Sequence, residues 1–280
     1  MSSFRSKIII WMIRNRHLFQ GHLKPEVVDE SFSVDKFRAH VDSASAKVKL
    51  PADVGVQAVR MGGMYAEWIA PQSPSEGKVL LYIHGGGFIS GSCLTHRMHM
   101  ARFARECGIR SLKWLLEQGI APHNIVVGGE SAGATLTLSL LLALKEQQID
   151  LPRDAYVISP VTDLRCGAAS FTYNAPHDVA PMGSWTVWTN MYIAGNDPTA
   201  PLLSPLFGDF RGLPPLYICV GTHEIHYDDC IAIARVAREH GVDVTLREWD
   251  RMVHAFPLLP PLFPEAKAAF AEICAFVKNL

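Results

Sequence analysis

The stretch that decides the fold is Gly129-Glu130-Ser131-Ala132-Gly133. It directly follows the apolar run Ile125-Val126-Val127 and opens a long segment rich in Leu and Ala, which we expect to be a helix. A serine between small residues at a strand-to-helix junction is a G-x-S-x-G elbow, in which a tight, strained turn lifts the serine Oγ above the sheet. The dipole of the following helix favours negative charge there. This context favours Ser131 as a nucleophile over an ordinary glycine-rich turn.

A second glycine-rich stretch, His84-Gly85-Gly86-Gly87-Phe88, ends another apolar run. Parallel sheets build their ligand sites at the carboxyl ends of strands, and three glycines let backbone N–H groups turn inward. We expect the amides of Gly85, Gly86 and Ala132 to form an oxyanion hole, rather than the stretch being only a flexible turn. His84 is expected to brace this loop and not to carry protons.

Strand and helix signals alternate along most of the chain. Strands are predicted at Val56–Met61, Tyr65–Ile69, Lys78–Ile83, Asn124–Gly128, Ala155–Ser159, Pro215–Val220 and Val242–Trp249. Helices are predicted at Leu94–Cys107, Ser111–Gln118, Ser131–Gln147, Asp228–His240 and Pro264–Leu280. The first two strands, joined by Gly62-Gly63, predict an antiparallel hairpin. The alternation predicts an α/β fold with a mostly parallel central sheet flanked by helices.

Two segments fall outside this alternation. Residues 1–50 carry helical patterns without a strand signal and are expected to form an N-terminal helical cap segment, before a catalytic domain at residues 51–280. Residues 165–205 are too long for an ordinary connection and are expected to be a cap insertion. The apolar run Ile8–Ile13 is far shorter than the ~20 residues of a membrane span. It lacks a cleavage site, so an amphipathic helix is favoured over a signal peptide or an interfacial anchor.

Charge and cysteine usage limit the partners. Lys and Arg number 26 against 27 Asp and Glu, without a long basic run, so no nucleic-acid partner is expected. Six cysteines occur without a C-x-x-C pair: Cys93, Cys107, Cys166, Cys219, Cys230 and Cys274. They are expected to be free thiols in a reducing compartment, which, with no convincing signal peptide, predicts a cytoplasmic protein.

The general base should follow the last strand, because after a G-x-S-x-G nucleophile the acid and then the histidine come later in the chain. Of the twelve histidines, His254 meets this requirement. It would take the proton from Ser131 and return it to the leaving alcohol.

The acid is less constrained, because three carboxylates follow the strand that ends at Val220. Glu224, the first of them and four residues past the strand, is favoured, since glutamate can orient a histidine as aspartate does. Asp228 stays as the alternative, although Asp228 and Asp229 also suit the N-terminus of the next helix. Histidines stand on both sides of Glu224, at His223 and His226, but this spacing lacks the partners of a metal site, and no metal is expected.

The HGGGF loop, the GESAG elbow and the later order of acid and histidine resemble the hormone-sensitive-lipase-type (bacterial family IV) esterases of the α/β-hydrolase superfamily. The resemblance covers nearly the whole chain. It implies a helical cap and hydrolysis of short- to medium-chain acyl esters without a cofactor. An amidase, deacetylase or lactonase on the same triad remains an alternative, as does a catalytically impaired binding protein. Such relatives commonly dimerise, which leaves a homodimer open.

Four apolar side chains are candidates for the pocket walls: Phe88, Trp185, Trp188 and Met191. They indicate a small, uncharged ester as substrate, although each residue also suits a hydrophobic core.

The chain departs from the family between His84 and Ser131, where it is roughly two dozen residues shorter than such relatives. The helix that ends at Cys107 and the one predicted at Ser111–Gln118 should lie on opposite faces of the sheet. Three residues between them reach ~10 Å, but crossing the sheet takes roughly 20 Å. We therefore expect an internal deletion near Arg110-Ser111. A missing piece is favoured over a fold that has lost an inner strand.

Overall fold

The computed structural model describes residues 2–21, 27–61, 63–74, 78–107, 110–111, 120–181, 183–259 and 263–278. The described residues form an eight-stranded sheet in the order β1-β2-β4-β3-β5-β6-β7-β8. The strands are β1 (Val54–Met61), β2 (Met64–Pro71), β3 (Val79–Ile83), β4 (Arg110–Ser111), β5 (Ile125–Glu130), β6 (Asp154–Ile158), β7 (Leu216–Gly221) and β8 (Val244–Trp249). All neighbours from β4 to β8 in this order pair in parallel, which confirms the predicted architecture.

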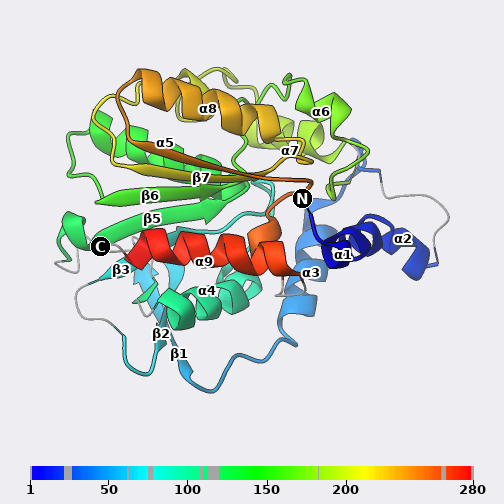
Figure 1. The fold of residues 1–280 in the computed structure, drawn as a ribbon, viewed down its shortest axis with the longest axis horizontal. Helices are drawn as coiled ribbons and strands as arrows, with labels where there is room; N and C mark the ends of the chain where they lie inside the picture. The colour runs from blue at the N-terminus through cyan, green and yellow to red at the C-terminus, as the bar shows by residue number, and fades with distance from the viewer. Residues whose placement is uncertain are drawn as a thin grey trace.

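The helices of the described residues lie on both sides of this sheet. They are α1 (Phe4–Arg14), α2 (Arg16–Phe19), α3 (Val34–Ser45), α4 (Cys93–Cys107), α5 (Ala132–Glu146), α6 (Ser170–Tyr173), α7 (Ser184–Ile193), α8 (Tyr227–Glu239) and α9 (Pro264–Lys278). In Figure 1, α5 and α8 cover one face of the sheet, and α4 and α9 cover the other.

The strands at the centre of the sheet are apolar throughout because both of their faces are buried. Along β5, Val126 packs into the hydrophobic cluster under α4 and α9, and the next residue, Val127, packs into the cluster under α5 and α8. Successive residues of a strand point to opposite faces, so a strand covered on both sides is a continuous apolar run. The same burial places the carboxyl end of β5, and with it Ser131, at one edge of a rigid sheet.

The predicted hairpin at the start of the sheet is confirmed. β1 and β2 pair antiparallel from Val54 opposite Pro71 to Met61 opposite Met64. The other predicted strands, and the helices corresponding to α4, α5, α8 and α9, lie within two residues of the predicted bounds in the described part of the chain.

β4 was not predicted. Its two residues lie between β2 and β3, with Ser111 opposite Ile69 and Arg110 opposite Val79. The prediction of a helix beginning at Ser111 is therefore wrong at that residue, because its backbone pairs with strands on both sides. The remainder of that predicted helix, residues 112–118, lies outside the described residues. Among the described residues, these two occupy the inner position of the sheet, and the alternative in which an inner strand is lost stays untested.

The helices α1, α2, α3, α6 and α7 lie towards one end of the molecule, in the right half of Figure 1. They come from the two segments expected to form the cap, residues 1–50 and 165–205. Trp188 of α7 packs with Phe32 and Phe37, so the two segments are in contact. The exact domain boundaries remain a prediction.

The turn into α5 leaves no space for a side chain at Gly133. A Cβ built there would lie 2.1 Å from the carbonyl oxygen of Ile83 and 2.5 Å from that of His84. Gly133→Ala is expected to lower the free energy of unfolding by about 3 kcal/mol, because backbone atoms must move to admit the methyl group. Urea unfolding measures this loss. Gly167→Ala is the matched control, since a Cβ at Gly167 meets nothing within 4 Å, and equal midpoints for the two variants would contradict the prediction.

Candidate active site

Ser131 stands at the junction of β5 and α5 in a strained backbone conformation. Its φ of 57° and ψ of −127° lie where a residue with a side chain is rarely found. The conformation is held by the Ser131 N–H, which donates to the Ile158 carbonyl at 2.8 Å. The close approach of Gly133 to Ile83 also depends on this turn. These are the features expected of an elbow that points its serine out of the sheet.

His254 lies beside Ser131, from a loop that follows β8. Its Nε2 is 2.9 Å from Ser131 Oγ, within hydrogen-bonding distance. Two contacts fix the loop. The His254 N–H donates to Asp178 Oδ1 at 2.9 Å, and the Ala255 N–H donates to Ser159 Oγ at 3.1 Å. The structure therefore brings together the two residues that the sequence predicted as nucleophile and base.

Glu224 approaches His254 from the opposite side. Its Oε2 is 3.4 Å from His254 Nδ1, and its Oε1 accepts a 2.5 Å hydrogen bond from the Gly221 N–H. The side chain is completely buried. Asp228, the alternative acid, is engaged elsewhere, because its carboxylate accepts hydrogen bonds from the Ser170 N–H and the Tyr173 hydroxyl. The geometry thus favours Glu224 as the partner of the base.

The electrostatics of this pair follow from burial and proximity. Burial on its own lowers the pKa of His254, but the hydrogen bond and charge of Glu224 outweigh it and raise that pKa above its usual value. Burial likewise raises the pKa of Glu224, and His254 opposes this shift. An imidazole whose pKa is raised by a carboxylate is a stronger base towards a serine hydroxyl.

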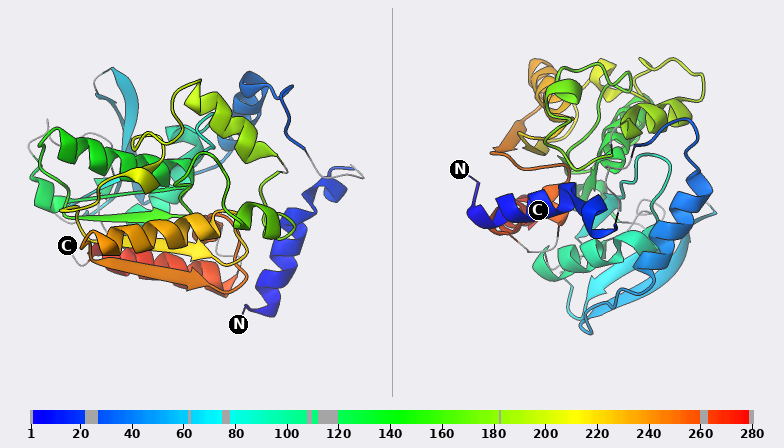
Figure 2. Two further views of the ribbon diagram at one scale, coloured as in Figure 1. Left: turned by 90° about the horizontal axis from the view of Figure 1, so that it is seen from above. Right: turned by 90° about the vertical axis from the view of Figure 1, so that its right-hand side faces the viewer.

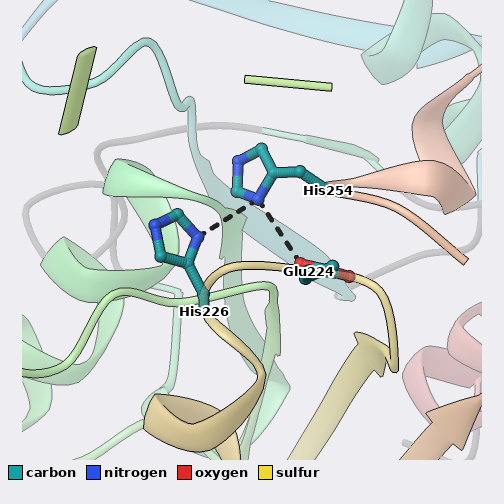
Figure 3. A group of neighbouring side chains, drawn as sticks. All are labelled: Glu224, His226 and His254. Carbon is teal, nitrogen blue, oxygen red and sulfur yellow. Dashed lines mark hydrogen bonds and ion pairs between the residues drawn. The ribbon is translucent and has the colours of Figure 1, made fainter. Parts of the chain in front are cut away.

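A third side chain, His226, packs against the same pair (Figure 3). Its Nδ1 is 3.2 Å from His254 Nδ1, so it lies beside the nitrogen that faces Glu224. Trp185 packs edge-on against His226 with ring centroids 4.1 Å apart. Burial lowers the pKa of His226 well below its usual value, and the neighbouring His254 adds to this. Burial therefore favours the neutral form of His226, and in the tautomer with its proton on Nε2, its Nδ1 can accept a hydrogen bond in competition with Glu224.

The ligand atoms of Glu224, His226 and His254 all lie within 4.8 Å of one another, the one such group found among the described residues. The sequence had paired His223 rather than His254 with Glu224 and His226. His223 instead stacks on His177 with ring centroids 4.7 Å apart. The expectation that the protein holds no metal stays a prediction. A metal bound by this group would be coordinated by His254 Nδ1, the nitrogen that faces Glu224.

The glycine loop after β3 does not leave the Gly85 amide free. Its N–H donates to Glu130 Oε1 at 2.6 Å, and the same carboxylate accepts from the Tyr82 hydroxyl and lies 2.9 Å from His96 Nε2. Burial alone raises the pKa of Glu130, but these partners, His96 first, hold it below its usual value. Gly85 therefore anchors the loop to the residue that precedes the nucleophile.

A pocket of about 540 Å³ opens over Ser131 and His254. Its described lining includes Gly86, Gly87, Phe37, Trp185, Trp188, Leu258 and Leu259. Two of the predicted wall residues, Trp185 and Trp188, are among them. The other two are elsewhere: Phe88 stacks on Tyr192 with centroids 4.3 Å apart, and Met191 is 39% exposed. The pocket is thus mainly apolar, with polar groups gathered at the serine.

Asp178 was missed by the sequence analysis. Besides the His254 N–H, its carboxylate accepts the Ile225 N–H at 2.9 Å. One side chain thus holds the backbones of both loops that carry the histidine and the acid. It lies in the segment expected to form the cap insertion, and no sequence signal connects it with loops that are distant along the chain.

Three comparisons with known proteins agree with this geometry. Residues 104–258 match a family model described as the alpha/beta hydrolase fold. An acetyl-hydrolase of Streptomyces hygroscopicus is 35% identical over 253 residues, covering 82% of this chain and 83% of that protein. An esterase of Acinetobacter venetianus is 31% identical over 252 residues, covering 81% of this chain and 83% of that protein.

Among solved structures, the chain is similar to an esterase from the bacterial hormone-sensitive lipase family. The TM-score is 0.88 at 32% sequence identity, and the match covers 100% of this chain and 99% of the other. The similarity therefore extends over the cap segments as well as the sheet.

Proposed function

Because the chain belongs to the hormone-sensitive-lipase-type esterases of the α/β-hydrolase family, which are carboxylic ester hydrolases, we propose that it acts as a serine carboxylesterase through an acyl-enzyme on Ser131. The observation that carries the proposal is the 2.9 Å separation of Ser131 Oγ and His254 Nε2 in a strained elbow. Nucleophile and base within hydrogen-bonding reach, with a third group orienting the base, are the requirement for covalent catalysis.

In acylation, His254 Nε2 takes the hydroxyl proton as Ser131 Oγ attacks the ester carbonyl. The carbonyl π electrons move to the oxygen, which becomes an oxyanion. When the tetrahedral intermediate collapses, the bond to the alcohol oxygen breaks, and His254 gives its proton to that oxygen. Glu224, 3.4 Å from Nδ1, stabilises the imidazolium during both steps. Deacylation repeats the sequence with water as nucleophile, releasing the acid and restoring Ser131.

The oxyanion needs N–H donors that have no other acceptor. The amide of Ala132, at the N-terminus of α5, and that of Gly86 were expected to supply two of them. The third expected donor, Gly85, already donates to Glu130. We therefore assign the third position to Gly87, which lines the pocket beside Gly86 and Ser131. Neither the Gly86 nor the Gly87 amide has a hydrogen-bond partner in the part of the chain that is described.

The substrate that fits this pocket is an uncharged ester with a short to medium acyl chain. Hydrolysis of p-nitrophenyl esters is expected to be fastest for short acyl chains and to fall by at least about tenfold at palmitate. Added methylenes gain ~0.8 kcal/mol each while they are buried, and we expect this gain to end where the acyl chain meets the pocket walls formed by Phe37, Trp185 and Trp188. The series from acetate to palmitate measures this. A rate that keeps rising to palmitate would contradict it.

An amide with the same acyl group separates esterase from amidase activity, because both share the tetrahedral intermediate and differ in the leaving group. We expect the matched ester to be cleaved at least about a hundredfold faster, since an alcohol oxygen leaves the tetrahedral intermediate more readily than an amine nitrogen, which must be protonated first. Comparable rates would support the amidase alternative.

We also propose that the chain lacks an internal piece near Arg110-Ser111. One observation supports this: the match to the Streptomyces acetyl-hydrolase extends over 253 positions, more than the 82% of this 280-residue chain that it covers, so the relative has residues for which this chain has no counterpart. Intact mass spectrometry of the protein purified from its natural source is expected to give a larger mass than 30.9 kDa. A mass of 30.9 kDa would contradict the missing piece and leave the short connection as a property of the working enzyme.

A further inference from the structure

Exposed apolar side chains gather at one end of the molecule, where Figures 1 and 2 show α1 and α2 beyond the edge of the sheet. In α1 they are Phe4 (78% exposed), Ile8 (46%), Trp11 (53%) and Met12 (45%), which we call the α1 face. Leu18 and Phe19 of α2 are also exposed, by 48% and 64%. An apolar patch of this kind on a folded protein marks an interaction surface.

The spacing of these residues puts them on one side of the helix. Phe4, Ile8, Trp11 and Met12 follow the i, i+4, i+7, i+8 pattern of a single helical face. The opposite side already holds α1 in place: Ile10 is buried in the core, and Ser3 and Ser6 at the start of the helix donate to the carboxylate of Glu265 in α9. The α1 face is thus not needed to attach the helix to the protein.

Basic side chains border the α1 face on both edges. Arg5 lies next to Ile8 and Met12 on one edge, and Lys7 and Arg14 lie next to Trp11 on the other. These three cations are exposed and make no ion pair with another described residue. The chain has no Asp or Glu before Glu26. The border that α1 itself supplies therefore has one sign of charge, and the carboxylates of Asp250 and Glu265 bond to Ser2, Ser3 and Ser6 at the start of the helix.

Against the sequence expectation, which disfavoured an interfacial anchor here, we propose that the α1 face docks on an anionic lipid surface, with α1 lying in the plane of the interface. An apolar stripe with Trp and Phe, flanked by Lys and Arg, buries its apolar side in the lipid while its cations meet the headgroup charges. Among the described residues, α1 included, no helix has the length and apolar character to cross a membrane. A second copy of the chain fits the face less well, because two such faces would bring like charges together.

The position of α1 relative to the pocket agrees with this assignment. Arg16, just after α1, donates from Nη1 to the Val179 carbonyl at 3.0 Å. Val179, Ala180 and Pro181 line the pocket over Ser131. Docking through α1 would therefore hold the lipid surface near a wall of the pocket. The docking itself does not depend on the esterase chemistry, so it can be measured in a variant without the nucleophile.

The test is co-sedimentation of the full chain carrying Ser131→Ala with lipid vesicles, since this variant cannot hydrolyse the lipid. Vesicles of phosphatidylcholine alone are compared with vesicles in which about a third of the lipid is phosphatidylglycerol. We expect at least about tenfold tighter binding to the anionic vesicles, weakening as salt is added.

Two sets of substitutions, each added to Ser131→Ala, separate the apolar and the charged contributions. Phe4→Ser with Trp11→Ser should lower binding about tenfold. Lys7→Glu with Arg14→Glu should remove the preference for anionic lipid.

The matched control carries Ile149→Ser and Leu202→Ser, which remove two side chains of 38% and 44% exposure elsewhere on the surface. It should bind like the parent, and thermal melting should show all variants folded. Equal binding to the two kinds of vesicle, or binding unchanged by Phe4→Ser and Trp11→Ser, would overturn the proposal. So would light scattering that shows a dimer which these two substitutions abolish, because the face would then join two copies of the chain.

Discussion

Ser131→Ala is expected to lower kcat/KM for p-nitrophenyl butyrate by about 10⁴-fold or more, the largest effect of any single substitution considered. Removing Oγ removes the atom that forms the acyl-enzyme, and the remaining oxyanion donors and pocket support a small residual rate. The melting temperature should hardly change. Among the described residues, Oγ bonds to His254 Nε2, so the substitution removes one hydrogen bond and leaves the packing of α5 in place. Steady-state kinetics and thermal melting on the same sample measure both quantities.

Ser139→Ala serves as a comparison for this variant. Ser139 is a buried serine of α5, and its Oγ donates to the Thr135 carbonyl at 3.1 Å within the same helix. It should retain far more activity than Ser131→Ala. Full turnover by Ser131→Ala would show that another group is the nucleophile.

Glu224→Gln is expected to lower kcat by roughly 10²–10⁴-fold, with a smaller change in KM. The amide can donate to His254 Nδ1, which favours the tautomer with its proton on Nε2, and that nitrogen then cannot accept the proton of Ser131. In the proposed mechanism, Glu224 acts through His254 and is a positioning residue.

The pH profile distinguishes this role from a general loss of structure. Glu224 raises the pKa of His254, and catalysis needs the neutral imidazole, so kcat/KM of the wild type falls as the pH drops through that raised pKa. Removing the carboxylate charge lowers the pKa, and the acid limb of the profile should move to lower pH. Asp228→Asn is the control, because Asp228 bonds to Ser170 and Tyr173 instead. An unmoved limb in Glu224→Gln, or a loss of turnover confined to Asp228→Asn, would contradict the assignment.

The parts of the site that the sequence predicted depend on residues that are neighbours along the chain. The elbow around Ser131 needs small residues between a strand and a helix, and this requirement is visible in neighbouring residues. The sheet could be predicted for a related reason: strands buried on both faces are continuous apolar runs, as in β5.

The parts that were missed depend on residues distant in sequence. The Gly85 amide is turned towards Glu130 by a hydrogen bond, and nothing in the glycine loop itself indicates that partner. Asp178 joins two loops across the fold, and His226 meets His254 because β7 and β8 are neighbours in the sheet. β4 escaped prediction because two residues carry no periodicity, and their pairing with β2 and β3 alone defines them as a strand.

For α1, the prediction from the sequence was incomplete for a different reason. Its sequence favoured an amphipathic helix over an interfacial anchor, and α1 is a helix, but the sequence could not tell which side the protein itself would bury. Ile10 turned inward, and Phe4 and Trp11 were left outside. The surface that results follows from how α1 packs on α9.

The central claim is that Ser131 forms the covalent acyl intermediate, and labelling with a fluorophosphonate tests it most directly. The folded wild-type chain is treated with the reagent, digested, and analysed by mass spectrometry while hydrolysis of p-nitrophenyl butyrate is followed. The account predicts one adduct per chain, on the peptide that contains Ser131, with loss of activity in proportion to labelling. Folded protein that hydrolyses the ester but carries no adduct on Ser131 would contradict it.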